Sequence, residues 1–111
     1  MLINFVKNGK LLIAVLSGEL DHHSAESVRV KIDNKLEELV EVNLLFDFSG
    51  VNFMDSSGIG VVIGRYKKIS EYGGKVGIIN LKPEIKRVFQ VGGLFRIINE
   101  YSDAEDALKS F

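Results

Sequence analysis

The sequence predicts an α/β domain in which strands and helices alternate along the chain after an opening pair of strands. Short apolar runs of strand length alternate with segments whose apolar residues recur at three- and four-residue steps, as in amphipathic helices. The first two runs flank an Asn-Gly pair at positions 8–9, which is a strong hairpin signal. The expected order is β-β-α-β-α-β-α-β-α, with short right-handed crossovers between parallel strands.

The first two strands are expected to pair with each other. Residues 2–6 have the alternating pattern of a strand, and residues 10–17 form a second, more apolar run. Asn8 and Gly9, between the two runs, both tolerate the positive φ that a two-residue hairpin turn requires. Residues 2–17 are therefore predicted to form an antiparallel hairpin.

The first helix is expected to begin at about Ser24 and to precede a buried strand. An apolar stripe at helical spacing is formed by Ala25, Val28, Ile32, Leu36 and Leu39. Charged side chains are expected on the opposite, solvent-facing side: Glu26, Arg29, Lys31, Asp33, Lys35 and Glu37. The near-continuous apolar run at residues 42–48 predicts a central strand that helices cover.

A second helix is expected to run from about residue 56 toward Tyr72, where two glycines end it. Its inward stripe is predicted to hold Ile59, Val62, Ile63, Tyr66 and Ile69. Its outward stripe is predicted to hold Ser57, Gly60, Val61, Gly64 and Lys68. A glycine inside a helix costs about 1 kcal/mol relative to alanine, so Gly60 and Gly64 indicate a surface kept flat for a partner.

The remaining elements are short, and a turn or cap residue marks each of them. In chain order they are a strand at 76–79, a helix from Pro83 to Gly92-Gly93, a strand at 97–98 and a last helix. Proline suits the first turn of a helix because its missing N–H has no partner there. Ser102 and Glu105 have the spacing of a capping box that opens the last helix. Its apolar residues are Ala104, Leu108 and Phe111.

Composition and charge exclude several classes of protein. The chain has 111 residues, which fit one domain over residues 1–111, and 46% of them are apolar. A formal charge of −1 gives no electrostatic case for binding nucleic acid or an acidic membrane. The absence of cysteine excludes disulfides and thiolate sites. With no apolar run of about 18 residues and no signal-peptide pattern, a cytoplasmic location is expected.

The segment DSSGIG at residues 55–60 lies between the central strand and the second helix. A hydroxyl there stands at a helix N-terminus, where free N–H groups and the helix dipole favour an anion. Gly58 and Gly60 leave room for a phosphate or another chain. We therefore predict a phosphorylated or partner-facing serine, and physical reasoning does not separate Ser56 from Ser57. The simpler alternative is that one of the two serines caps the helix.

Other chemistry finds less support in the sequence. His22 and His23 could bind a metal or carry a phosphoryl group. Two adjacent histidines are too few for a closed metal site. A structural role at the start of the first helix is therefore favoured. The acidic pair of a receiver domain, the Gly-x-Ser-x-Gly of serine hydrolases and the phosphate-binding loop are all missing. We expect no enzyme activity, no cofactor and no metal.

Five segments of the chain resemble the anti-sigma factor antagonists of the STAS (sulphate transporter and anti-sigma antagonist) family. They are GELDHHSAE at 18–26, FMDSSGIGV at 53–61, GRYK at 64–67, KRVF at 86–89 and GLFRII at 93–98. The likeness covers nearly the whole chain and is closest to the sporulation members. It implies a mixed β-sheet with an N-terminal antiparallel hairpin and about four helices packed mainly on one side.

The resemblance also implies a partner-switching role. The unmodified protein would bind an anti-sigma factor that is itself a serine kinase, and this would free the sporulation sigma factor F. The kinase would phosphorylate the first serine, Ser56, with Ser57 as the alternative acceptor, and a serine phosphatase would reset the switch. The expected contact surface comprises Asp21, His22, His23, Ser24, Asp55, Ser56, Ser57, Gly58, Gly60, Val61 and Gly64. The alternatives are an antagonist in a stress-response pathway and a phosphocarrier that uses His22 or His23, while the family leaves nucleotide binding open.

Overall fold

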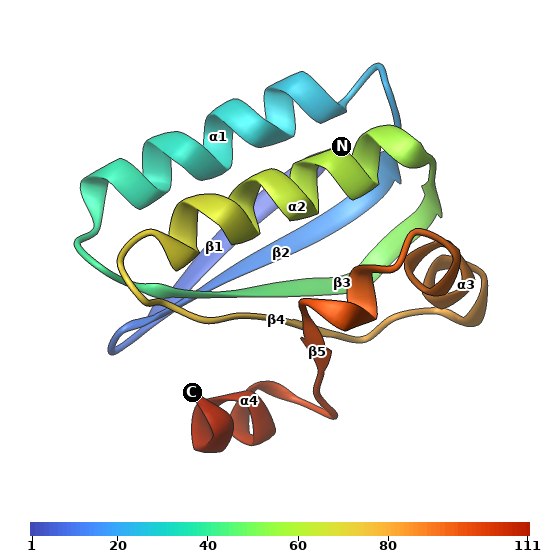
Figure 1. The fold of residues 1–111 in the computed structure, drawn as a ribbon. Helices are drawn as coiled ribbons and strands as arrows, with labels where there is room; N and C mark the ends of the chain where they lie inside the picture. Colours follow the sequence, from blue (N-terminus) through green and yellow to red (C-terminus); the bar gives the residue numbers. More distant parts are fainter.

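The computed structural model describes residues 1–111 as one five-stranded mixed sheet with helices on both faces (Figure 1). The elements are β1 (Leu2–Asn8), β2 (Leu11–Leu20), α1 (Ala25–Glu38), β3 (Asn43–Met54), α2 (Ser56–Ser70), β4 (Val76–Ile79), α3 (Pro83–Val91), a 3₁₀ turn (Leu94–Arg96), β5 (Asn99–Glu100) and α4 (Ala104–Ser110). The strands lie side by side in chain order, with β1 antiparallel to β2 and every other pair parallel. The predicted fold class and element order are confirmed.

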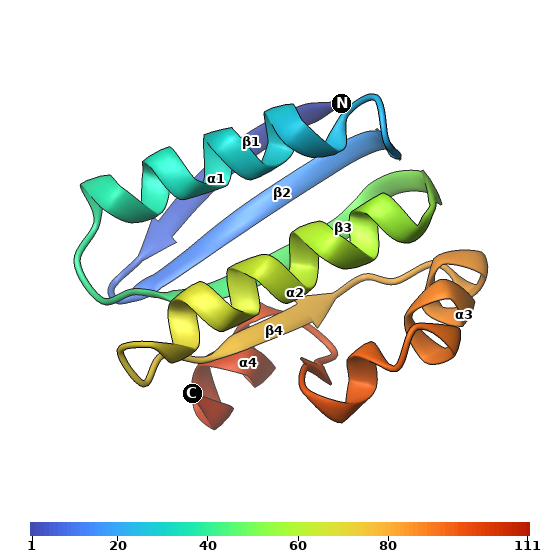
Figure 2. The same cartoon turned by 45° about the horizontal axis from the view of Figure 1, so that its top comes forward.

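The helices divide unequally between the two faces of the sheet. Helices α1 and α2 lie next to each other across one face, and α4 lies against the other (Figures 1 and 2). The larger core fills the first interface, where Leu44, Phe46 and Phe48 alternate inward along β3. Phe48 meets Phe89 of α3 edge to face, with ring centroids 5.6 Å apart. Leu45 points to the opposite face and packs in a small second cluster with Ala107 of α4.

The opening hairpin has the predicted pairing with its turn displaced by one residue. Asn8 pairs with Leu11, so the two residues of the turn are Gly9 and Lys10. Gly9 has a φ of 59°, which glycine adopts without steric cost. Asn8 remains in the strand, and Gly9 alone supplies the positive φ.

Strand β3 is longer than predicted. It continues past residue 48 to Met54, so that a strand leads directly to Asp55 where a loop was expected. Within this extension, Gly50 lies opposite Ser17 of β2. A Cβ on Gly50 would stand 2.4 Å from the Cβ of Ser17. Glycine is therefore required here by the close approach of two strands.

The flanks of α1 and α2 that face each other are buried, which corrects two predictions. Asp33, expected in solvent, is only 9% exposed, and its Oδ1 lies 2.9 Å from Nε of Arg65, which is 7% exposed. Val61, expected on the outward stripe, is 6% exposed. Desolvation lowers the pKa of Arg65, and the charge of Asp33 opposes that effect. A helical wheel that considers only the sheet misses this second buried flank.

The C-terminal segment also departs from the prediction in detail. Ile98 is buried in the core, and the strand lies two residues later than predicted, at Asn99–Glu100, where Asn99 pairs with Gly77. The cap of α4 is Asp103, whose carboxylate accepts a hydrogen bond of 2.8 Å from the N–H of Asp106, so the Ser102–Glu105 capping box was wrong by one position. The buried residue of α4 is Ala107, and Leu108 is 39% exposed. None of the helices has the length and apolar character needed to cross a membrane.

Candidate functional site

Two loops meet at the carboxyl ends of β2 and β3. Leu20 and Met54 are the last residues of these strands and pair with each other. The N–H of Asp55 then donates to the carbonyl of Leu20, at 3.2 Å. Residues 21–24 and 55–57, which the sequence predicted as parts of one surface, therefore start from neighbouring strand ends. In open α/β sheets this edge is where ligands commonly bind.

Helix α2 is capped by the aspartate that precedes the two serines. The Oδ1 of Asp55 accepts a hydrogen bond of 2.8 Å from the N–H of Ser57. The serines themselves occupy the first two positions of the helix, and neither hydroxyl has a hydrogen-bond partner within the domain. The alternative in which a serine serves as the cap is therefore wrong. Ser56 is exposed and Ser57 is half-buried.

The glycines of α2 fall into two kinds. A Cβ on Gly58 would stand 2.6 Å from Cγ of Met54 and 3.0 Å from Cγ of Leu20. Gly58 is thus required by packing inside the domain and does not open space for a ligand. A Cβ on Gly60 or Gly64 would meet no atom within 4 Å. Nothing within the domain requires glycine at these two positions, and a surface kept flat there for a partner stays a prediction.

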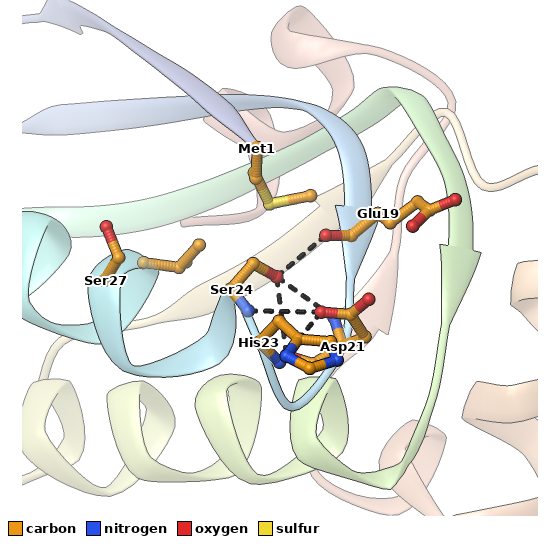
Figure 3. A pocket seen from close by; sticks show the side chains of 7 residues that line it. Met1, Glu19, Asp21, His23, Ser24 and Ser27 are labelled. Atoms are coloured by element: carbon orange, nitrogen blue, oxygen red, sulfur yellow. Dashed lines mark hydrogen bonds between the residues drawn. The ribbon is translucent and has the colours of Figure 1, made fainter.

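Asp21 organises the loop between β2 and α1 (Figure 3). Its Oδ1 accepts hydrogen bonds from the N–H groups of His23, at 2.9 Å, and Ser24, at 3.1 Å. The hydroxyl of Ser24 donates to the carbonyl of Glu19, at 2.7 Å, and caps no helix N–H group. Desolvation raises the pKa of Asp21, but the N–H groups of Ser24 and His23 outweigh it, and the pKa lies below its ordinary value.

His22 and His23 belong to the first loop, and both residues are exposed. Nδ1 of His22 is 3.9 Å from Oδ2 of Asp55, and the His22 side chain is 70% exposed. The rings of His22 and His23 lie against each other, with centroids 3.9 Å apart. In the loop that leads into α1, His23 donates its backbone N–H to Asp21, and neither imidazole caps the helix. No group of three or more metal-binding side chains is present.

A cavity of about 570 Å³ adjoins the Asp21 loop but does not include either serine of α2 (Figure 3). It is lined by Met1, Glu19, Asp21, His23, Ser24, Ser27 and Val28. All of these residues come from the N-terminal end, β2, α1 and the loop between them. Ser56 lies outside this cavity and is exposed on the surface, where another macromolecule can reach it.

Comparison with known proteins places this geometry in a family. The STAS domain family matches residues 3–107. An anti-sigma F factor antagonist of Paenibacillus polymyxa is 38% identical over 98 residues, which cover 88% of this chain and 84% of the relative. An anti-sigma-B factor antagonist of Bacillus subtilis is 30% identical over 94 residues, covering 85% of this chain and 84% of the relative.

Solved structures agree with these relatives. Unphosphorylated SpoIIAA, an anti-sigma factor antagonist, matches with a TM-score of 0.82 and 29% identity, covering 99% of this chain and 98% of its own. The phosphorylated form of Bacillus SpoIIAA matches with a TM-score of 0.73 and 30% identity, covering 98% of each chain. The chain belongs to the STAS domain family and, within it, to the anti-sigma factor antagonists that SpoIIAA represents.

Proposed function

We propose that the unphosphorylated chain binds an anti-sigma factor that is also a serine kinase, that this binding frees the sporulation sigma factor F, and that phosphorylation of Ser56 ends it. Ser56 carries the proposal because it is the exposed first residue of α2 and its hydroxyl is free. Asp55 takes over the capping role, so modification of Ser56 removes no hydrogen bond from the domain. The family is one of regulatory proteins and not of enzymes.

Exposure favours Ser56 over Ser57 as the acceptor. A kinase must reach the hydroxyl with its own catalytic groups and ATP, and Ser56 is exposed while Ser57 is half-buried. The N–H of Ser57 is also engaged by Asp55, which holds this residue in the first turn. The family resemblance supports the same choice, because the first serine of the motif is the one modified.

The switch follows from electrostatics. Phosphorylation adds about −1.5 to −2 charges and three acceptor oxygens. The N-terminus of α2 tolerates this charge in the free domain. A docked partner, however, would desolvate both the phosphate and the neighbouring Asp55 carboxylate, and affinity should fall by several kcal/mol. Both forms of SpoIIAA resemble this chain closely in fold, which supports a switch without refolding.

The proposed contact surface combines the two loops with the glycine stripe of α2. It includes Asp21, His22, His23 and Ser24 from one loop, Asp55 to Ser57 from the other, and Gly60 with Gly64 along the helix. Gly58 and Val61 are buried and contribute indirectly, by setting the shape of the first turns of α2. A dedicated serine phosphatase would restore the binding form.

A stress-response antagonist remains the second candidate, supported by the 30% identity to the anti-sigma-B factor antagonist of Bacillus subtilis. The 38% identity to anti-sigma F factor antagonists from two organisms favours the sporulation pathway. Competition binding with the two kinds of anti-sigma factor would separate these candidates. The proposed pathway requires tighter binding to the anti-sigma F factor.

The direct test of the modification site is phosphopeptide mapping after incubation with the cognate anti-sigma kinase and ATP. The parent chain and a Ser57→Ala variant should each gain one acid-stable phosphate on Ser56, and Ser56→Ala should gain none. Phosphate on Ser57 would overturn the assignment. Phosphate that is lost in acid would indicate His22 or His23 and overturn the proposed switch.

A further inference from the structure

Strand β1 forms one edge of the sheet and lacks the usual protection of an edge. It pairs with β2 on one side only, over seven residues without a bulge. Natural sheets shield a free edge with a very short strand, a proline, a bulge or charged side chains. The opposite edge follows this rule, because β5 has only two residues. Strand β1 contains no proline, and its single charged side chain, Lys7, lies near its end, so its free edge is available to another strand.

The edge strand also carries apolar side chains that its own domain covers incompletely. Leu2 is 71% exposed and Val6 is 51% exposed, and both point to the same face of the sheet. Ile3 and Phe5 alternate with them and are half-buried on the other face, where they pack against the larger core. Apolar surface therefore borders the unpaired backbone on both faces of the sheet.

The geometry of the hairpin determines which backbone groups of β1 face outward. Its two-residue turn closes on the pair formed by Asn8 and Leu11, and the closing pair of such a turn is hydrogen-bonded. Hydrogen-bonded and non-hydrogen-bonded pairs alternate along an antiparallel ladder. The backbone groups of the even-numbered residues of β1 are therefore directed to β2. Those of residues 3, 5 and 7 are directed to the free edge.

One register of β1 against a second copy of itself matches apolar residues on both faces. In an antiparallel pair with its two-fold axis at Asn4, Ile3 of each copy lies opposite Phe5 of the other. Leu2 of each copy then lies opposite Val6 of the other. The outward-directed backbone groups of residues 3 and 5 meet in the same register. Cross-strand apolar pairs each stabilise a sheet by about 0.2–1 kcal/mol, so the strand is complementary to itself.

The neighbouring register and the nearby charges favour the same arrangement. A pairing with its axis at Phe5 would place Ile3 opposite Lys7 and lose an apolar pair. Lys35 of α1 lies over the ring of Phe5, with Nζ 5.9 Å from the centroid, and its charge is balanced by Glu38 at 3.0 Å. The whole chain has a formal charge of −1, so two copies repel each other only weakly.

We propose that two copies of this chain associate through their β1 strands, joining two five-stranded sheets into one continuous sheet with a two-fold axis at Asn4. The seven residues of β1 are fewer than the roughly 20–30 residues per side of a stable interface, so the association is reversible and depends on concentration. Strand β2 separates β1 from β3, which leads to Ser56. The association leaves the serine of each copy open and is independent of the proposed function.

The absence of cysteine allows a direct test by cross-linking. In the proposed register Asn4 faces its counterpart in a non-hydrogen-bonded pair, with Cα atoms about 4.5 Å apart, which is within disulfide range. Asn8 is the matched control, because it is exposed on the same strand and face but has no residue opposite it in the second copy. Under mild oxidation we expect Asn4→Cys to form a disulfide-linked dimer about tenfold faster than Asn8→Cys.

Sedimentation of the reduced proteins measures the association itself. The mass of the parent should rise with concentration from 12.3 kDa toward twice that value. Asn4→Lys places two like charges opposite each other and should weaken dimerisation about fivefold, whereas Asn8→Lys should change it less than about twofold. An equal mixture of Asn4→Lys and Asn4→Asp should associate more tightly than either variant alone. Thermal melts check that all variants fold like the parent.

Three results would each overturn the proposal. The first is a parent chain that remains monomeric up to its solubility limit. The second is equal cross-linking of Asn4→Cys and Asn8→Cys, which would indicate random collision. The third is a dimer that Asn4→Lys does not weaken, because its interface would then lie elsewhere on the molecule. In all three cases the proposed function would stand.

Discussion

Oδ1 of Asp55 accepts a hydrogen bond of 2.8 Å from the N–H of Ser57, so the aspartate caps α2 and neither serine hydroxyl is needed as a cap. An aspartate at this position satisfies a free N–H group and places negative charge at the positive end of the helix dipole. The cap and the proposed acceptor hydroxyl therefore belong to adjacent residues, Asp55 and Ser56. Modification at Ser56 would therefore leave the cap of α2 intact.

Loss of the cap should destabilise the free domain. We expect Asp55→Ala to lower the free energy of unfolding by about 1 kcal/mol and the melting temperature by about 4 °C. Asp55→Asn should keep most of that stability, because asparagine caps a helix about as well as aspartate. Thermal and urea unfolding measure both variants. Equal stability of Asp55→Ala and the parent would show that the contact contributes nothing to folding.

The two outward glycines of α2 should show opposite effects on stability and on binding. Gly60→Ala and Gly64→Ala should each raise the free energy of unfolding, by up to about 1 kcal/mol, because alanine is the better helix former and the added methyl group meets no atom. Both should weaken binding to the anti-sigma factor. Gly58→Ala is the contrasting control and should lower stability, since its methyl group would contact Met54.

Much of the fold follows from local sequence patterns. The near-continuous apolar run at residues 42–48 and the helical spacing of Val28, Ile32 and Leu36 correctly located the core. The errors arise where a second partner acts on the same residue. The central strand was expected to end at residue 48, but Gly50 pairs with Ser17 of β2. Asp33 was expected in solvent because the sequence does not show that α2 lies beside α1.

The candidate site was predicted in part. The resemblance predicted that residues 21–24 and 55–57 belong to one surface, and the structure places them at neighbouring strand ends. The capping role of Asp55 was missed, although the preference of aspartate for this position could have indicated it. Two cavities between the end of β3 and α3 could not be predicted, because no periodic pattern connects the lining residues of β3 and α3 with Ile59 of α2.

The buried ion pair between α1 and α2 gives an asymmetric prediction. Asp33 faces three cations, with Nε of Arg65 at 2.9 Å, Nη1 of Arg29 at 3.4 Å and Nζ of Lys68 at 3.8 Å. Asp33→Asn leaves these cations facing one another and should cost about 3 kcal/mol of stability. Arg65→Met should cost less, because Arg29 and Lys68 still neutralise Asp33. Urea unfolding compares the two variants, and the reverse order would contradict this account.

Asp21 should make the loop sensitive to acid. Its pKa in the folded chain lies below the ordinary value, so the unfolded chain takes up the proton first as the pH falls. The contribution of this carboxylate to stability is therefore present above about pH 4 and is lost below it, as the pH falls through the folded pKa. Asp21→Asn should flatten this part of the stability curve. Unfolding measured from pH 6 to pH 3 tests the difference, and curves of the same shape would contradict it.

A negative charge introduced at Ser56 should reproduce part of the loss of affinity without a kinase. Ser56→Asp adds one negative charge, fewer than a phosphate, and should weaken binding to the anti-sigma factor about tenfold, because the charge must be desolvated beside Asp55. Ser56→Ala should bind like the parent and stay bound when ATP is added. Ser70→Asp, at the exposed far end of the same helix, is the matched control and should change affinity little. If Ser56→Asp binds as tightly as the parent, charge and desolvation do not explain release. The phosphate would then have to act through its size or through a structural change of α2.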